Sequence, residues 1–303
     1  MTHIADATPD NPMPRTAEIR TSSADPDGRA VTIIRPPAFS LATLWQAATR
    51  LSQYRDLLYT LSAHRVQVRY KQSVLGPLWA ILQPLSLMLI YTLIFWGLAR
   101  VKTDGIPYTL FAYAALLPWT CFSTAVSTAT NSLISHFNLV TKVYFPREIL
   151  PLTYVIAAVV DLAAGSVILA GLIAYYGVPM TMQALWAIPV VGVMVVLSFA
   201  VSLVLSAIQV RFRDIGMAMP LLLQVWMFAT PVVYPLSAVP EHWRTLYMLN
   251  PLVGVIENLR RVLLLGRPPD FESLAMSTVV SFGLLTVAFL YFKRVESTMA
   301  DVL

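Results

Sequence analysis

The sequence predicts an all-α integral membrane protein with six transmembrane helices. Its 303 residues are 57% hydrophobic and only 12% charged, whereas soluble domains carry roughly 25% charged residues. Residues 72–99 form a run of 28 positions without Asp, Glu, Lys or Arg, and about 20 apolar residues suffice to cross a bilayer. Further long apolar stretches follow between charged loops, and a membrane lets such stretches face lipid.

Two regions precede the first apolar stretch. Residues 1–38 are polar, without hydrophobic periodicity or a signal-peptide core, so we expect a disordered cytoplasmic tail. Residues 39–71 predict an amphipathic interface helix lying in the membrane surface, because they directly precede a span. An ordinary soluble helix is the alternative. The expected apolar face consists of Tyr54, Leu57, Leu58, Leu61 and Val68, interrupted by Arg65.

Residues 72–303 are expected to form the transmembrane domain. The gaps between charged residues place the spans at about 77–99, 108–133, 150–176, 185–210, 215–234 and 273–292. Gly76-Pro77 predicts a bend before the first span, with Trp79 near the interface. The positive-inside rule places both termini in the cytoplasm, because fifteen of the 21 Lys and Arg residues then lie inside.

The loop between the last two spans carries two helix signals. Pro240-Glu241 begins one short stretch, and Asn250-Pro251 is a cap and first-turn signal for another. In the second stretch one face is apolar and the other is charged, through Glu257, Arg260 and Arg261. We expect these helices either to re-enter the outer half of the membrane or to form a solvated periplasmic cap.

Motifs for catalysis and cofactor binding are absent from the sequence. It has no Gly-rich loop ending in Lys-Ser or Lys-Thr, no G-x-S-x-G elbow, and four scattered His residues without metal-ligand spacing. We therefore expect no catalytic residue, no metal site and no cofactor bound by this chain. The net charge of +5 suits anionic lipid better than nucleic acid.

Two inner loops could receive a soluble partner. Pro146 and Pro151 bracket Arg147-Glu148, which favours a fixed shape over a floppy turn. Arg211-Phe212-Arg213-Asp214 follows the fourth span. For each loop the alternative is an ordinary positive-inside stop signal.

Asp161 is the one carboxylate in the middle of a span and lies among small residues. We expect a hydrogen-bonded packing role rather than a proton or substrate site, because the other spans offer no charged partner. Aromatic residues of the first two spans could stack on sugar rings or form an interfacial belt. They are Tyr91, Phe95, Trp96, Phe111, Trp119 and Phe122.

Four motifs then occur in a suggestive order along the chain. They are Arg69-Tyr70-Lys71-Gln72-Ser73-x-Leu75-Gly76-x-x-Trp79, then Phe145-Pro146-Arg147-Glu148-Ile149-Leu150-Pro151, then Arg211-Phe212-Arg213-Asp214, then Asn250-Pro251. From about Tyr54 to its carboxyl end the chain resembles the ABC-2 type permeases that export polysaccharides, which include O-antigen, capsule and teichoic-acid exporters.

The resemblance implies a permease homodimer in the bacterial inner membrane, paired with two copies of a separate ATPase that binds ATP and Mg. The ATPase coupling residues would be Asn138, Lys142, Tyr144, Phe145, Pro146, Arg147, Glu148, Arg211, Arg213 and Asp214. The outer gate would include Trp243, Asn250, Glu257, Arg260 and Arg261. Arg69 and Lys71 would receive the anionic head group of a lipid-linked polysaccharide, or would only anchor the chain to lipid phosphates.

Two alternatives remain open at this point. An ion-gradient-driven secondary carrier would use Asp161 as its ion site and need no ATPase. An ABC-2 exporter of a small lipid or drug would share the permease architecture but not the polysaccharide.

Overall fold

The computed structural model describes residues 52–71, 73–98, 103, 105–143 and 145–302. They belong to one compact unit, Leu44–Leu303. Within these ranges every long element is a helix and no strand occurs, which confirms the all-α fold class. The expected tail and the expected amphipathic segment before residue 52 lie outside the described residues.

Five helical segments are long and apolar enough to cross a membrane: Gly76–Gly97, Tyr108–Thr130, Ile149–Tyr175, Met182–Arg211 and Phe271–Glu296. They match the predicted spans one to four and six within a few residues. The first combines η1 (Gly76–Leu78), α3 (Trp79–Tyr91) and a π-helical turn η2 (Thr92–Leu98). The others are α4 (Tyr108–Thr130), α7 (Ile149–Tyr175), η3 (Met182–Trp186) with α8 (Ala187–Arg211), and most of α12 (Phe271–Val302).

The fifth predicted span is shorter than expected. Its helix, α9, runs from Asp214 to Phe228 over 15 residues, which is roughly 22 Å at 1.5 Å per residue. The prediction of a helix to Tyr234 is wrong, because Pro231 has no N–H to donate and side chains from elsewhere bind the carbonyls that follow. The chain then forms η4 (Leu236–Ala238) and the two expected short helices, α10 (Glu241–Met248) and α11 (Pro251–Leu263).

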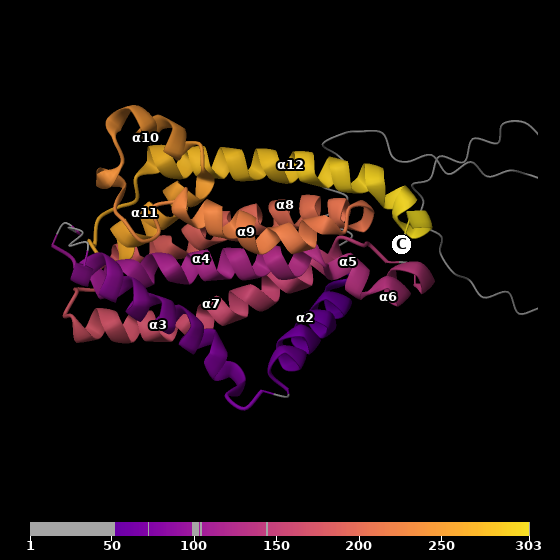
Figure 1. The fold of residues 1–303 in the computed structure, drawn as a ribbon, viewed down its shortest axis with the longest axis horizontal. Coiled ribbons are helices and arrows are strands. Elements are labelled where there is room, and N and C mark those ends of the chain that lie inside the picture. Colours follow the sequence, from indigo (N-terminus) through magenta and orange to yellow (C-terminus); the bar gives the residue numbers. More distant parts are fainter. Residues whose placement is uncertain (1–51, 72, 99–102, 104, 144, 303) are drawn as a thin grey trace, which may run out of the picture. The chain divides into compact units, whose positions relative to one another are not determined.

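The helix α4 lies at the centre of the packing (Figure 1) and contacts α3, α7, α8, α9 and α11. Its side chains Leu110, Tyr113, Leu116 and Phe122 are fully buried. By contrast, the first span leaves many large apolar side chains exposed; they include Leu89 and Ile90 of α3 and Leu93 and Trp96 of η2. An apolar outer face of this kind suits lipid as the surrounding solvent.

A second apolar cluster forms at the end of the bundle where α5 (Ser132–Ser135) and α6 (Phe137–Lys142) lie. Figure 1 shows both short helices beside the carboxyl end of α12. The cluster joins residues from five helices and from the loop between α6 and α7: Leu133, Val140, Phe145, Ile149, Val210, Phe292 and Met299. The inner loops predicted from the sequence therefore gather at one end of the bundle.

The amphipathic helix α2 (Arg55–Tyr70) packs against α7. Tyr54, Leu57, Leu58 and Leu61 contact the second cluster, as the pattern predicts. Val68 is exposed, so its place on the apolar face was wrong. Arg65 is not an interruption of that face, because its guanidinium lies 4.5 Å over the ring of Tyr154 on α7.

Candidate functional site

A cavity of about 370 Å³ opens where α2, α3, α4 and α7 meet. Its polar wall consists of Arg69, Tyr70, Gln83, Thr120, Thr124, Thr128 and Asp161, and its apolar wall includes Trp79, Pro84, Leu117 and Leu162. A space with charged and hydroxyl groups on one side and hydrocarbon on the other suits a ligand with both characters. Within the described residues we take it as the candidate substrate site.

Local sequence explains how these side chains converge. Gly76 has φ of +53°, a left-handed conformation that glycine adopts without a steric cost, and it turns the chain from α2 into α3. The bend predicted at Gly76-Pro77 is thus confirmed. On α4 the three threonines are spaced four residues apart, which places them on one helix face. This spacing of four residues is visible in the sequence and is the signal that distinguishes these threonines.

The charges in the cavity neutralise each other. The Arg69 guanidinium forms an ion pair with the Asp161 carboxylate, and the Tyr70 hydroxyl donates to Asp161 Oδ1 at 2.6 Å. Burial, followed by the hydrogen bond to Asp161, raises the pKa of the Tyr70 phenol to about 12, so this group remains a proton donor at neutral pH.

The structure corrects the expectation for Asp161. The other spans carry no charged partner for it. The partner comes from α2, which precedes the first span. The carboxylate is hydrogen-bonded, as expected, but it lines the cavity instead of serving helix packing alone. Lys71 is exposed and is not among the residues that line the cavity.

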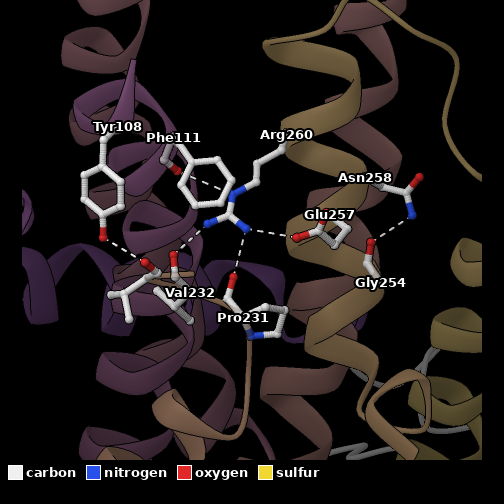
Figure 2. Close-up of polar contacts among 9 residues, drawn as sticks. Tyr108, Phe111, Pro231, Val232, Gly254, Glu257, Asn258 and Arg260 are labelled. Atoms are coloured by element: carbon white, nitrogen blue, oxygen red, sulfur yellow. Dashed lines mark hydrogen bonds and ion pairs between the residues drawn. The ribbon is translucent and has the colours of Figure 1, made fainter. Parts of the chain in front are cut away.

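At the opposite end of the bundle from α5 and α6, Arg260 organises a second polar cluster (Figure 2). Its side chain points from α11 toward α4 and the loop after α9. It donates to the carbonyls of Pro231 at 2.8 Å and Val232 at 2.6 Å, and to Glu257 at 2.9 Å. Its guanidinium carbon lies 3.5 Å from the ring centroid of Phe111. The Tyr108 hydroxyl donates to the Val233 carbonyl at 2.7 Å.

This cluster corrects the predicted polar face of α11. Arg260 is only 3% exposed, so it holds the non-helical loop after α9 instead of facing water. Most of α11 is buried against α4, α8 and α12. Asn250 caps α11 by accepting from the Leu252 N–H at 3.2 Å, as predicted. Trp243 of α10 is exposed, and Arg261 donates to the Pro268 carbonyl at 2.6 Å.

The predicted coupling residues divide into an exposed and an internal group. Asn138, Lys142, Arg211, Arg213 and Asp214 are exposed at the end of the bundle that carries α5 and α6. Phe145 is buried, Pro146 is half-buried, and Tyr144 lies outside the described residues.

Arg147 and Glu148 make internal contacts to α12. Arg147 donates to the backbone carbonyl of Glu296. Glu148 is 1% exposed and accepts from Lys293 at 2.8 Å. Lys293 also pairs with Glu296 at 2.8 Å. A direct contact of Glu148 with a soluble partner is therefore excluded in this conformation, because its carboxylate is enclosed. No local sequence pattern identifies Lys293 as its partner.

The predicted channel aromatics divide in the same way. Phe111, Trp119 and Phe122 are buried in the core of this chain, and Phe122 packs edge-on against Trp226 with ring centroids 5.1 Å apart. They do not line a surface, so the expectation for these three is wrong. Trp96 is exposed, while Tyr91 and Phe95 are half-buried. Among the described residues no group of three or more His, Cys, Asp or Glu could hold a metal ion.

Comparison with known proteins gives a consistent picture. The family model for the ABC-2 type transporter matches residues 56–264. The chain is 34% identical over 253 residues to the O-antigen export system permease protein RfbA of Myxococcus xanthus, covering 83% of this chain and 96% of that protein. It is 28% identical over 249 residues to a protein of that name from Klebsiella pneumoniae, covering 82% and 95%.

A more distant relative is the polysialic acid transport protein KpsM of Escherichia coli, 23% identical over 251 residues that cover 79% of this chain and 93% of the relative. The family match spans well over half of the chain and includes α2, the cavity and α11. This chain therefore belongs to the ABC-2 type transporter family.

Proposed function

We propose that this chain is the membrane permease subunit of an ATP-driven exporter that moves a lipid-linked, O-antigen-like polysaccharide out of the cytoplasm. The observation that carries the proposal is the similarity over 96% of the length of a Myxococcus permease for O-antigen export. Two copies of the permease would pair with two copies of a separate ATPase, which would bind ATP and Mg.

The cavity supports a lipid-linked anionic substrate. Its guanidinium and hydroxyl groups suit a phosphate-bearing head group, and its apolar wall suits the lipid chain beside it. The sugar polymer would pass along the bundle between two copies. In this arrangement Arg69 receives the head group, and Lys71 attracts it from the membrane surface.

The proposal also assigns a membrane topology. With α5, α6 and the end of α12 on the cytoplasmic side of the inner membrane, both termini are cytoplasmic. The helix α9 is then a sixth, short span, and the non-helical loop after it continues across the rest of the membrane. The helices α10 and α11 act as the outer gate, and α11 re-enters the outer half of the membrane. Burial of α11 and of the irregular loop before it, whose carbonyls accept from Arg260 and Tyr108, supports re-entry, because non-helical backbone at membrane depth requires protein around it.

A secondary carrier using Asp161 fits the geometry less well. An ion site must bind and release its ion, whereas the Asp161 carboxylate holds both Arg69 and Tyr70. The carrier should function without an ATPase and fail when Asp161→Asn is introduced. An exporter of a small lipid or drug would keep the ATPase but leave polysaccharide export unchanged when the gene is deleted.

Two measurements test the proposal. Deletion of the gene should cause the polymer to accumulate inside cells, and its normal appearance at the cell surface would refute polysaccharide export. Gentle purification of the tagged chain should recover an equimolar ATPase. Arg213→Ala, at the exposed coupling end, should reduce that recovery, while Arg244→Ala in α10 serves as the matched control and should not.

A further inference from the structure

We infer that Asp161 is an internal competitor for Arg69, which keeps the cavity closed to the singly charged phosphates of anionic bulk phospholipids and open to a lipid diphosphate. The inference rests on the proposed function and deepens it by naming the head group that the site accepts. It assigns Asp161 a role in specificity, distinct from ion transport and from packing.

The first step is the position of the pair. Arg69 and Asp161 have side-chain exposures of 29% and 18%, and hydrocarbon from Leu117, Pro84 and Leu162 lies around them. Water screens charges there less than at an open surface, so breaking the pair has a substantial cost. Any anion that binds Arg69 must meet this cost, whatever its own charge.

The second step compares the ligands by charge. The attraction of an anion to Arg69 grows with the charge of the anion, while the cost of releasing Asp161 is fixed. A phosphodiester carries one negative charge, as Asp161 does, so exchanging one for the other brings little gain. A diphosphate carries more charge and more acceptor oxygens, which match the fork of a guanidinium. Only the more highly charged ligand is attracted to Arg69 strongly enough to offset the cost of releasing Asp161.

The third step concerns what happens to Asp161 after the exchange. An unpaired, partly buried carboxylate would be unfavourable, but Tyr70 can continue to donate to Asp161 when Arg69 turns to a ligand, since it contacts the other carboxylate oxygen. Gln83 lines the same cavity and offers a further donor to the ligand. The cavity therefore contains the groups needed for both states of the pair.

The experiment measures binding of a fluorescent short-chain polyprenyl diphosphate to the full-length chain in phosphatidylcholine nanodiscs, with and without phosphatidylglycerol. For the wild type, the dissociation constant of the probe should be the same in nanodiscs with and without phosphatidylglycerol. Asp161→Asn should bind the probe about tenfold more tightly in phosphatidylcholine, the effect of about one charged hydrogen bond. In this variant, added phosphatidylglycerol should weaken binding of the probe, because its phosphate competes for Arg69. Arg69→Gln should lose at least about tenfold in either lipid.

Matched controls come from the same helix. Arg55 and Asp56 form an exposed pair with side-chain exposures of 83% and 96%, so Arg55→Gln and Asp56→Asn should bind like the wild type. Arg69→Lys keeps the positive charge and should retain part of the affinity, which separates loss of binding from misfolding. Inorganic diphosphate should displace the probe only at much higher concentration, and equal affinities would overturn the lipid part of the inference.

Two results would refute the role of Asp161 or of the site. If Asp161→Asn neither tightens binding nor creates competition by phosphatidylglycerol, Asp161 is not a competitor. If Arg69→Gln binds like the wild type, the cavity does not receive the head group. Failure of the proposed function has a different signature, which is normal polymer export in cells that lack the gene.

Discussion

Replacing Arg260 with Met should destabilise the end of the bundle that carries α10 and α11 more than any change of an exposed charge. The substitution keeps an unbranched apolar stem of similar length but removes hydrogen bonds to Glu257 and to the carbonyls of Pro231 and Val232. Each hydrogen bond to a charged group contributes about 1.5–3 kcal/mol. Breaking a buried ion pair by removing one partner costs about 3–5 kcal/mol.

The expected loss lies at the lower end of that range. Glu257 is 32% exposed, so its carboxylate can recover water when Arg260 is gone. We expect a loss of about 3 kcal/mol, since the two loop carbonyls and the face of Phe111 remain without a donor. This corresponds to a fall in Tm of roughly 6–12 °C for a chain of this size.

Thermal unfolding of the purified chain in a mild detergent measures this effect, and hydrogen exchange of residues 229–240 locates it. Arg261→Met is the matched control, because Arg261 is the next residue and makes one exposed hydrogen bond, to Pro268. Its Tm should change by less than about 2 °C, as surface substitutions usually contribute under about 0.5 kcal/mol. Equal Tm values for the two variants would refute the idea that Arg260 holds the loop.

Three further predictions concern other parts of the molecule. Glu148→Gln should lower stability by about 2 kcal/mol, because Lys293 loses one of its two carboxylate partners; no change in Tm would contradict an internal role for Glu148. Gly254→Ala should cost about 1–3 kcal/mol through overpacking, since a Cβ there would lie 2.8 Å from a backbone oxygen of α12. Gly192→Ala, where a Cβ meets no atom within 4 Å, should be neutral or stabilising, and equal losses would refute the close approach of α11 and α12. The pKa of Tyr70 is raised to about 12 in the folded chain, while an unfolded tyrosine has a pKa near 10. The protonated phenol therefore contributes its full stabilisation of the fold below about pH 10. That stability should be lost as pH rises from about 10 to 12, and Tyr70→Phe should remove this pH dependence from the Tm.

The sequence alone identified the membrane class and five spans, because an apolar segment long enough to cross a bilayer is recognisable from its own residues, wherever it lies in the chain. It also predicted the bend at Gly76 and the helix start at Asn250, since both depend on the conformational preferences of single residues. The apolar face of α2 was right apart from Val68, because a periodic pattern reports which side is buried but not how far along the helix burial extends.

The partners of charged residues were decided only by the tertiary structure. Asp161 seemed isolated until α2 brought Arg69 beside it, and Glu148 seemed exposed until α12 placed Lys293 against it. These pairs join residues that are 92 and 145 positions apart, and no local periodicity encodes such a distance. Arg260 shows the same limit, because its helix pattern placed it on a charged face, whereas packing buried it against Phe111 and an irregular loop. Helix patterns follow from short-range geometry, while the pairing of buried charges depends on which helices pack together.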